Sequence, residues 1–435
     1  MKKVLVVSYY WPPSGGIGVH RCLKFVKYLR EFGWEPVVYA PSNAAYPVED
    51  ESNFKDIPKN INIIKRPIWE PYDLYKKLIG KKKEEKIYHV FIEEENEPKF
   101  AKNIGIWIRG NLFIPDARKF WIKPSVKFLT DYLQHNKVDA VFSNGPPHSA
   151  HLIAMGVKEN LGIPWLADFQ DPWTQIDYYS KLMISPFADK VHKKLEQKVF
   201  SKADKITIVS ETWKKDLESI GANDVSVIVW GFDEQEFNNI KVNPDSKFTI
   251  SHFGSLGPDR DVKLFWKALS IIAGENSSFK DDLSLQLVGF VDNSILKEIT
   301  NLGLQSNLKR VSQIPRDEAL KMMCGSNLLL LILNIAYNVM GRLPGKLFEY
   351  LGSKRRILVV GPPESDAAKI VNNAGAGQAV DFNDLEGMIR IIKTLYEEFL
   401  ISRQIPSSKN DVSQYSNKNL TGKLSGFLNE IIASK

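Results

Sequence analysis

Cysteine and histidine are scarce in this sequence, which has two Cys and seven His among 435 residues. Cys22 and Cys324 lie about 300 positions apart, and neither has a second cysteine at metal-ligand spacing. The sequence therefore has no zinc or redox motif, and it does not fit a disulfide-stapled secreted fold. Reduced cytosol is the expected compartment.

Long apolar runs are also missing. The most apolar later segment, residues 328–336, is far shorter than the roughly 20 residues that cross a bilayer. The apolar stretch after the initial lysines covers only residues 4–7, which is too short for an export signal. We therefore expect neither a membrane span nor export.

The charge balance is mild, with 58 basic and 51 acidic side chains and a net charge of +7. The cations are spread along the chain with acids among them, which argues against nucleic-acid binding. Hydrophobic residues make up 43% and aromatic residues 11%, which is typical of a folded chain and not of a disordered one. The length suggests two or three domains.

Short β-branched runs alternate with longer amphipathic stretches along the chain. Residues 4–10, 19–32 and 35–39 have the patterns of a strand, a helix and a strand, so a βαβ unit begins the sequence. Such an alternation is typical of helices packed on a parallel sheet. The fold class predicted from the pattern is α/β.

The alternation restarts after a turn at residues 231–233, with a new strand at 248–253. The second half of the chain is thus another α/β sheet domain, and no low-complexity linker separates it from the first. The predicted organisation is an N-terminal domain at residues 1–228, a C-terminal domain at 229–415 and a terminal helix at 416–435.

Two segments within the first domain stand outside this pattern. The charge runs at residues 81–86 and 93–95 are typical of a solvated face. Residues 104–123 interleave large apolar side chains with cations, which suits the surface of an anionic membrane. An ordinary packed helix with exposed Arg and Lys explains the same segment, and both interpretations stay open.

The first candidate site is the turn at residues 12–18, between the first strand and its helix. Gly15, Gly16 and Gly18 allow backbone N–H groups to approach a ligand, and the helix N-terminus favours an anion. A tight turn alone would need only one glycine. The spacing is not G-x-G-x-x-G, and no acidic residue ends the second strand, so a nicotinamide cofactor is disfavoured.

Two further candidate sites lie in the second domain. Residues 254–261 follow a strand and combine glycines with Arg260, which suits a diphosphate. In residues 341–350, Pro344 and Gly345 precede a helix that places Lys346 at its positive end. The alternative for this third site is an ordinary helix start with solvated charges.

These residues resemble the family 4 glycosyltransferases of GT-B architecture, and the resemblance covers most of the chain. It implies two Rossmann-like domains facing a central cleft, with a nucleotide sugar held by the C-terminal domain and a terminal helix packed back on the N-terminal domain. The motifs that carry it are residues 14–18, 203–210, 231–233 with Phe237, 254–260 and 345–351.

The resemblance assigns roles to particular residues. Glu349 stands where the family binds the ribose hydroxyls, and Arg260 stands where it places a diphosphate-binding lysine. Gly15 and Gly16 would contact the donor phosphates or border the acceptor pocket. The full predicted donor-binding set is Gly15, Gly16, Gly254, Ser255, Arg260, Arg342, Gly345, Lys346 and Glu349.

The sequence departs from the family pattern at three positions. Gly341 replaces the first glutamate of the paired-glutamate motif, which contacts the transferred sugar. Ser255 replaces an arginine, and Gln170 replaces a histidine that contacts the donor sugar. A subset of polysaccharide-assembly members resembles this chain in the segment around Gln170.

The catalytic candidates lie in the first domain. Asp168 and Asp171 stand just before a proline and a tryptophan, and we expect them near the reacting sugar. His148 and His151 follow a double proline, where a histidine serves equally well as a helix cap. The predicted catalytic set is Asp168, Asp171 and His148, with no metal.

The resulting expectation is a retaining glycosyltransferase that uses a UDP- or GDP-linked sugar and no cofactor. The acceptor would be a glycan or a lipid-linked molecule in cell-surface glycan biosynthesis. Such a protein would be cytoplasmic, with peripheral contact to an anionic membrane. Two alternatives stay open: a non-catalytic subunit that binds nucleotide or glycan, and a nucleotide-sugar 2-epimerase.

Overall fold

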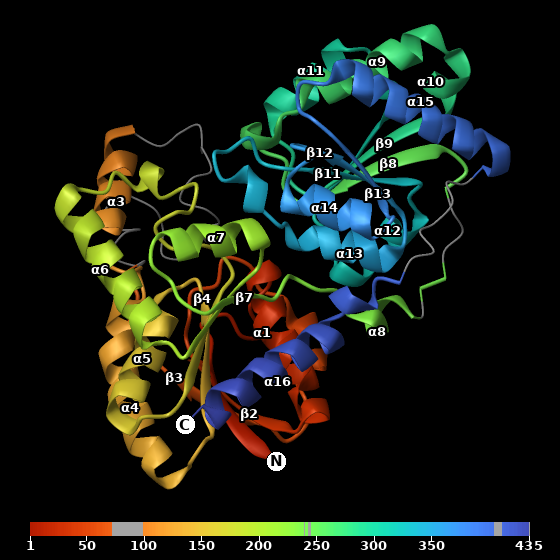
Figure 1. The fold of residues 1–435 in the computed structure, drawn as a ribbon. Coiled ribbons are helices and arrows are strands. Elements are labelled where there is room, and N and C mark those ends of the chain that lie inside the picture. The colour runs from red at the N-terminus through yellow and green to blue at the C-terminus, as the bar shows by residue number, and fades with distance from the viewer. Residues whose placement is uncertain (72–98, 239, 242–244, 404–410, 435) are drawn as a thin grey trace. The chain divides into compact units, whose positions relative to one another are not determined.

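The protein consists of two compact units, shown in Figure 1. Unit 1 comprises Met1–Val229 and Lys418–Lys435, and unit 2 comprises Trp230–Asn417. The computed structural model describes residues 1–71, 99–238, 240–241, 245–403 and 411–434.

Unit 1 is built on a seven-stranded parallel sheet with the order β3-β2-β1-β4-β5-β6-β7. Its central strands are buried on both faces along most of their length, which explains the short apolar runs within them. The strands are β1 (Lys2–Val7), β2 (Trp34–Pro41), β3 (Asn62–Arg66), β4 (Ala140–Gly145), β5 (Trp165–Phe169), β6 (Lys205–Ile208) and β7 (Val225–Val227).

Helices cover both faces of this sheet, with α4 and α5 on one side and α1 and α16 on the other (Figure 1). Leu420, Leu424, Leu428 and Ile431 of α16 share one face of that helix and join the core of unit 1. The helices are α1 (Ile17–Tyr28), α3 (Lys99–Asn111), α4 (Lys119–His135), α5 (Ser149–Leu161), α6 (Pro186–Lys202), α7 (Glu211–Ser219) and α16 (Asn417–Ala433).

Unit 2 repeats this plan with a six-stranded parallel sheet in the order β10-β9-β8-β11-β12-β13. Its middle strands are buried along nearly all of their length, and β9, β11 and β12 consist largely of Leu, Ile and Val. The strands are β8 (Phe248–Phe253), β9 (Leu283–Val288), β10 (Leu308–Val311), β11 (Leu328–Ile332), β12 (Arg356–Val360) and β13 (Gly377–Val380).

The helices of unit 2 form two layers, with α9, α10, α11 and α15 on one face and α12, α13 and α14 on the other (Figure 1). They are α8 (Glu234–Phe237), α9 (Lys263–Glu275), α10 (Ser277–Asp282), α11 (Asn293–Asn301), α12 (Arg316–Gly325), α13 (Gly345–Ser353), α14 (Asp366–Asn373) and α15 (Leu385–Ser402).

Each sheet has the strand order of a Rossmann fold, and this order determines where a ligand binds. The chain direction across the sheet reverses between β1 and β4 in unit 1 and between β8 and β11 in unit 2. In open α/β sheets, ligands bind beyond the carboxyl ends of the strands at such a reversal. The loops after β1 and β8 are therefore the places to look for a site.

The α/β class is confirmed, and most predicted elements lie within two or three residues of the observed ones. The strand predicted at residues 4–10 is an exception, because β1 ends at Val7. Tyr9 and Tyr10 instead meet edge to face, with ring centroids 5.0 Å apart. The charge runs at residues 81–86 and 93–95 lie outside the described residues.

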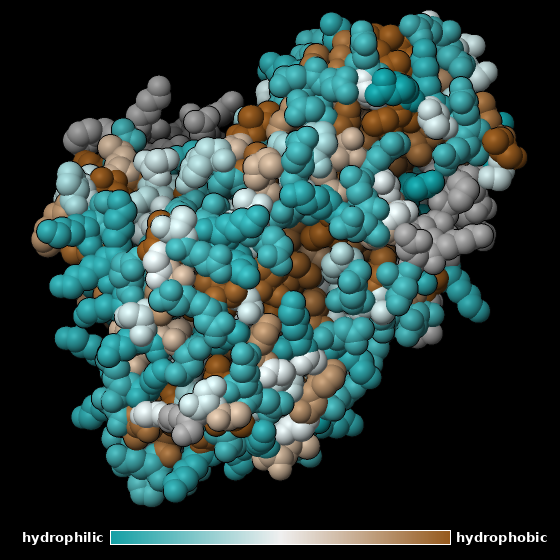
Figure 2. Space-filling view, viewed as in Figure 1, coloured by the Kyte–Doolittle hydropathy of each residue, from teal (hydrophilic) through white to brown (hydrophobic). Residues whose placement is uncertain are grey.

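None of the helices in the described part of the chain is both long enough and apolar enough to cross a bilayer. Most of the visible surface is hydrophilic (Figure 2).

Candidate functional site

The strongest candidate site lies in unit 2, where β8 ends at the strand-order reversal. Gly254 follows β8 with a φ of 97°, and its N–H donates to the carbonyl of Val288 at 2.8 Å. A Cβ atom at Gly254 would lie 2.9 Å from Nζ of Lys346. Glycine at this position therefore permits both the left-handed backbone and the close approach of a lysine.

Arg260 is fixed by two hydrogen bonds within this loop. Its Nε donates to Oδ1 of Asn334 at 2.9 Å, and its Nη1 donates to the carbonyl of Ser255 at 2.8 Å. Asn334 follows β11 and also donates its amide to Asp259. The guanidinium is thus fixed in place by loops at the ends of β8 and β11, the two strands of the reversal.

The N-terminus of α13 adds a second positive element. The helix begins at Gly345 after Pro344, and no side chain caps it. The first N–H groups of a helix have no partner within it and favour an anion. Lys346, the second residue of α13, is part-buried, and its Nζ lies 3.3 Å from Nε2 of His252 on β8.

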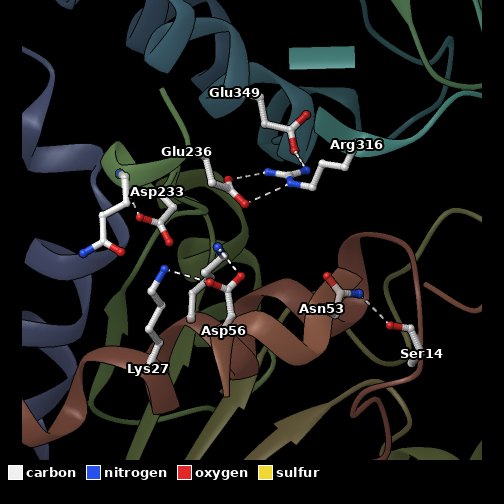
Figure 3. A network of polar contacts seen from close by, with 10 residues as sticks. Ser14, Lys27, Asn53, Asp56, Asp233, Glu236, Arg316 and Glu349 are labelled. Carbon is white, nitrogen blue, oxygen red and sulfur yellow. Dashed lines mark hydrogen bonds and ion pairs between the residues drawn. The ribbon is translucent and has the colours of Figure 1, made fainter. Parts of the chain in front are cut away.

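Glu349 lies one turn further along α13 and is engaged by an arginine (Figure 3). Arg316, the first residue of α12, donates through Nη1 to Glu349. The same guanidinium binds both oxygens of Glu236, with Nη2 at 2.9 Å and Nε at 3.2 Å. Arg316 therefore holds the Glu349 carboxylate in one position and carries a positive charge between two negative ones.

Five predicted donor-binding residues are thus close together in unit 2. Gly341 lies in a short turn just before α13, where it is buried, and Arg342 follows it. Among the described residues, no three His, Cys, Asp or Glu side chains gather as a metal site. The residues brought together are Gly254, Ser255, Arg260, Lys346 and Glu349.

Gly15 and Gly16 lie in unit 1, after β1. Gly16 has a φ of 77° and precedes α1, a conformation that favours glycine. The N–H of Gly15 donates to the carbonyl of Val48 at 2.8 Å, and a Cβ there would lie 2.9 Å from a methyl of Val48. Packing of this loop therefore explains Gly15 without a ligand.

The loop and α1 are tied to the segment after β2 by polar contacts (Figure 3). Asn53 donates its amide to the carbonyl of Ser14 at 2.8 Å. Lys24 and Lys27 of α1 each lie 2.7 Å from a different oxygen of Asp56. These contacts fix both the loop before α1 and the helix itself against the segment after β2.

Asp168, at the end of β5, is completely buried and accepts hydrogen bonds on both oxygens. Arg21 of α1 binds it with two nitrogens, Nε at 2.8 Å and Nη2 at 2.7 Å. Asn144 and Thr207 each donate to it at 2.7 Å. Because both carboxylate oxygens already accept hydrogen bonds from the protein, a positioning role for Asp168 is favoured over direct contact with a sugar.

His148 belongs to a buried aromatic cluster with His151, His192 and Trp173. The ring of His148 stacks on Trp173 at a centroid distance of 4.5 Å, and Trp173 donates to Nδ1 of His192 at 3.1 Å. Burial lowers the pKa of all three histidines, well below its usual value for His148 and to about 3 for His151. They are therefore neutral at physiological pH, and packing accounts for their positions.

Asp171 lies two residues beyond β5 and is half-buried. Gln170 beside it is buried and donates to Asn144 and to the carbonyl of Gly18 at 3.3 Å. The amide of Gln170 thus connects β4, the loop after β5 and α1 within unit 1.

Four residues that shape these sites were not predicted from the sequence: His252, Arg316, Asn334 and Arg21. Arg316 is 33 positions from Glu349, and Arg21 is 147 positions from Asp168, so no local spacing connects them. His252 carried a usable signal, because it is an ionisable residue in a fully buried strand. Such a residue needs a specific partner.

The fold is similar to that of glycosyltransferases of GT-B architecture whose structures are solved. A glycosyltransferase from Rickettsia africae ESF-5 has the same fold, with a TM-score of 0.63, 14% identity and coverage of 100% of this chain and 99% of that one. Anabaena Alr3699/HepE in complex with UDP-glucose has a TM-score of 0.61 and 14% identity, covering 99% and 100%. A UDP-N-acetylglucosamine 2-epimerase described as putative, from Listeria monocytogenes, has a TM-score of 0.56 and 10% identity, covering 100% and 97%.

The model of Glycosyltransferase Family 4 matches residues 88–236 of this chain. This match agrees with the resemblance to the family that the motifs indicate. Among curated protein sequences, none matches the chain.

Proposed function

We propose that the protein transfers a sugar from a UDP- or GDP-linked donor to a glycan or lipid-linked acceptor, with retention of configuration. The observation that carries this proposal is the cluster in unit 2 of Arg260, Lys346, the uncapped start of α13 and the fixed carboxylate of Glu349. A protein of this fold binds UDP-glucose, which supports a nucleotide sugar as the donor.

Each element of the cluster has a task in this reaction. The sugar–phosphate bond breaks as positive charge develops on the sugar and negative charge on the departing diphosphate. Arg260, Lys346 and the first N–H groups of α13 stabilise that negative charge without a metal. Glu349, oriented by Arg316, accepts hydrogen bonds from the ribose hydroxyls. The predicted absence of a metal and a cofactor stays a prediction.

A thermal-shift screen of UDP- and GDP-linked sugars tests donor binding. A ligand that binds only the folded state stabilises it and so raises the melting temperature. At a ligand concentration of a hundred times the dissociation constant, this stabilisation is about 2.7 kcal/mol. We expect one nucleotide series to stabilise the protein and adenine nucleotides to have no effect. A screen without any stabilising donor would contradict the proposal.

Gln170 favours one other candidate, a non-catalytic subunit that binds the donor. Family members have a histidine at the position of Gln170, and that histidine contacts the donor sugar. The side-chain amide of Gln170 instead binds Asn144 and the carbonyl of Gly18 within unit 1. Gly341 likewise removes a carboxylate expected at the sugar. Donor binding in the thermal screen combined with no release of the nucleoside diphosphate would favour this subunit.

A membrane contact is proposed for unit 1, on an aromatic-basic patch formed by Trp69, Leu112, Phe113, Lys119 and Phe120. Trp69 is 54% exposed and Phe120 44%, and their rings meet edge to face at 4.8 Å. The ammonium of Lys119 lies 5.4 Å from the ring of Phe120. Exposed rings beside a cation suit the headgroup region of an anionic bilayer.

Vesicle flotation tests this patch. The double variant Trp69→Ser, Phe120→Ser is expected to bind vesicles of phosphatidylglycerol about tenfold more weakly than the wild type, because two rings no longer bury apolar area. Ile401→Ser on α15 is the matched control, since Ile401 is 86% exposed outside the patch. Equal binding by the double variant and the wild type would exclude the patch as the membrane contact.

A further inference from the structure

Arg316 joins three helices of unit 2 through one guanidinium group (Figure 3). Its Nε and Nη2 donate to the two oxygens of Glu236 on α8, at 3.2 and 2.9 Å. Its Nη1 donates to Oε1 of Glu349 on α13. Because the three nitrogens belong to one rigid plane, the two bonds to Glu236 fix the direction in which Nη1 points. The position of the Glu349 carboxylate therefore depends on a residue of another helix.

Both carboxylates of this network are largely withdrawn from solvent. The side chain of Glu236 is 8% exposed and that of Glu349 is 14% exposed. Salt and water screen such groups much less than they screen exposed charges, and bonds between ionised partners are strong and directional. The network is thus a fixed part of unit 2 and differs from a surface ion pair, which contributes little.

Packing also holds α8 against α13. The rings of Phe232 and Phe237 meet edge to face, with centroids 6.0 Å apart. Both rings lie against Gly352 of α13, where a Cβ atom would lie 2.7 Å from Phe237 and 2.8 Å from Phe232. Only glycine permits so close an approach. The backbone that carries Glu236 is therefore fixed relative to α13 before any ion pair forms.

The second oxygen of Glu349 is open to a ligand. In the described part of the chain, the carboxylate of Glu349 accepts from Arg316 through Oε1, and Oε2 has no donor and is not closed off from solvent. Glu349 lies one turn from the start of α13, and the ribose of a nucleotide is attached directly to its diphosphate. With the diphosphate at the helix start, a ribose hydroxyl can therefore donate to Oε2.

We propose that Glu236 is a positioning residue for the donor ribose: through Arg316 it holds Glu349 with one oxygen free for a ribose hydroxyl. This inference rests on the proposed function, because it assumes that a nucleotide binds in unit 2. Without the charge of Glu236, the guanidinium turns to Glu349 and binds both of its oxygens. The hydroxyl then loses its acceptor. Glu236 thereby sets the preference of the site for nucleotides that carry ribose hydroxyls.

Isothermal titration of the full chain with UDP, GDP and their 2′,3′-dideoxy forms measures this preference. Hydrogen bonds to a charged group contribute enough to change affinity about tenfold or more, so the wild type is expected to bind the dideoxy form at least about tenfold more weakly. In Glu236→Gln the side-chain amide N–H2 faces an arginine donor, so the two-bond contact is lost. This variant is expected to bind the ribonucleotide about tenfold more weakly than the wild type and the dideoxy form equally well.

Two further variants separate orientation from charge. Arg316→Lys keeps the positive charge but has no planar group for Glu236 to orient, so it should lose the preference as well. It decides the question if Glu236→Gln does not fold. Glu234→Gln is the matched control, because it removes the same charge from an exposed position of α8 and should keep the wild-type preference.

Steady-state kinetics give a second readout. The ribose contact is present both in the bound donor and in the transition state, so its loss acts on binding. The KM of Glu236→Gln for the donor is expected to rise by a larger factor than kcat falls. A fall in kcat with an unchanged KM would contradict a role in holding the ribose.

A wild-type preference that persists in Glu236→Gln and Arg316→Lys would overturn the inference, and so would equal binding of both nucleotide forms by the wild type. Each of these results leaves the proposed function intact, since a nucleotide is still bound. Equal losses of affinity for both forms in Glu236→Gln would show a general disturbance of the site and would overturn the inference too. Absence of nucleotide binding by the wild type would count against the proposed function itself, and the inference would fall with it.

Discussion

Asp168→Asn is expected to lower the free energy of unfolding of unit 1 by about 3–5 kcal/mol, the range for breaking a buried ion pair from one side. The substitution leaves the guanidinium of Arg21 buried without its carboxylate. Arg21 would keep its hydrogen bonds to the carbonyls of Ile228 and Val229, at 2.8 and 2.9 Å. Urea unfolding, with hydrogen exchange of the β4, β5 and β6 peptides to localise the loss, measures the effect.

The double variant Arg21→Met, Asp168→Asn tests whether the loss of stability comes from leaving one charge of the pair buried and unpaired. Removing both charges should cost less than the sum of the single substitutions, because no unpaired charge remains buried. Asp131→Asn, at an exposed position on α4, should change stability by no more than about 0.5 kcal/mol. Wild-type stability of Asp168→Asn together with lost sugar transfer would instead make Asp168 a reacting group, as the sequence analysis predicted.

Arg260→Ala is expected to reduce turnover of the donor by about 10²–10³-fold, the usual cost of removing one group that stabilises developing negative charge. The guanidinium donates to the side chain of Asn334 and to the carbonyl of Ser255, and the Arg260 side chain is partly exposed. Its loss should therefore affect chemistry far more than stability. Steady-state kinetics and a melting curve on the same preparation measure the two effects.

Lys263→Ala provides the matched control for Arg260→Ala. Lys263 is an exposed cation three residues further along the chain, so both variants lose one positive charge. Glu349→Ala is expected to lose transfer in the same way, while Arg316 keeps Glu236 as its partner. Equal losses in Lys263→Ala and Arg260→Ala would point to a general charge effect and not to a diphosphate contact.

The sequence predicted the fold well because hydrophobic periodicity determines it. β8 has the bounds expected from the sequence, since it is a fully buried run between turn residues. β3, β10 and β13 were not predicted, because they are edge strands or nearly so and only partly buried. Their residues do not alternate or cluster strongly enough to stand out from a loop.

The sequence predicted only part of the candidate site. Glycines and cations that follow a strand predicted Gly254, Arg260 and Lys346, because the fold brings the ends of neighbouring parallel strands together. The partner that fixes Glu349 depends on packing between α12 and α13, and no spacing reveals it. For Asp168, the sequence motif resembled an exposed catalytic loop. In the structure its carboxylate is buried in an ion pair with Arg21, which the sequence does not reveal.

The central claim is that the cluster in unit 2 binds a nucleotide sugar and stabilises its departing diphosphate. The most direct measurement is release of UDP or GDP from the donor selected by thermal shift, compared between the wild type and Arg260→Ala. The account predicts turnover by the wild type and a loss of about 10²–10³-fold in the variant. Equal turnover by both proteins, or donor binding by the wild type without any release, would contradict it.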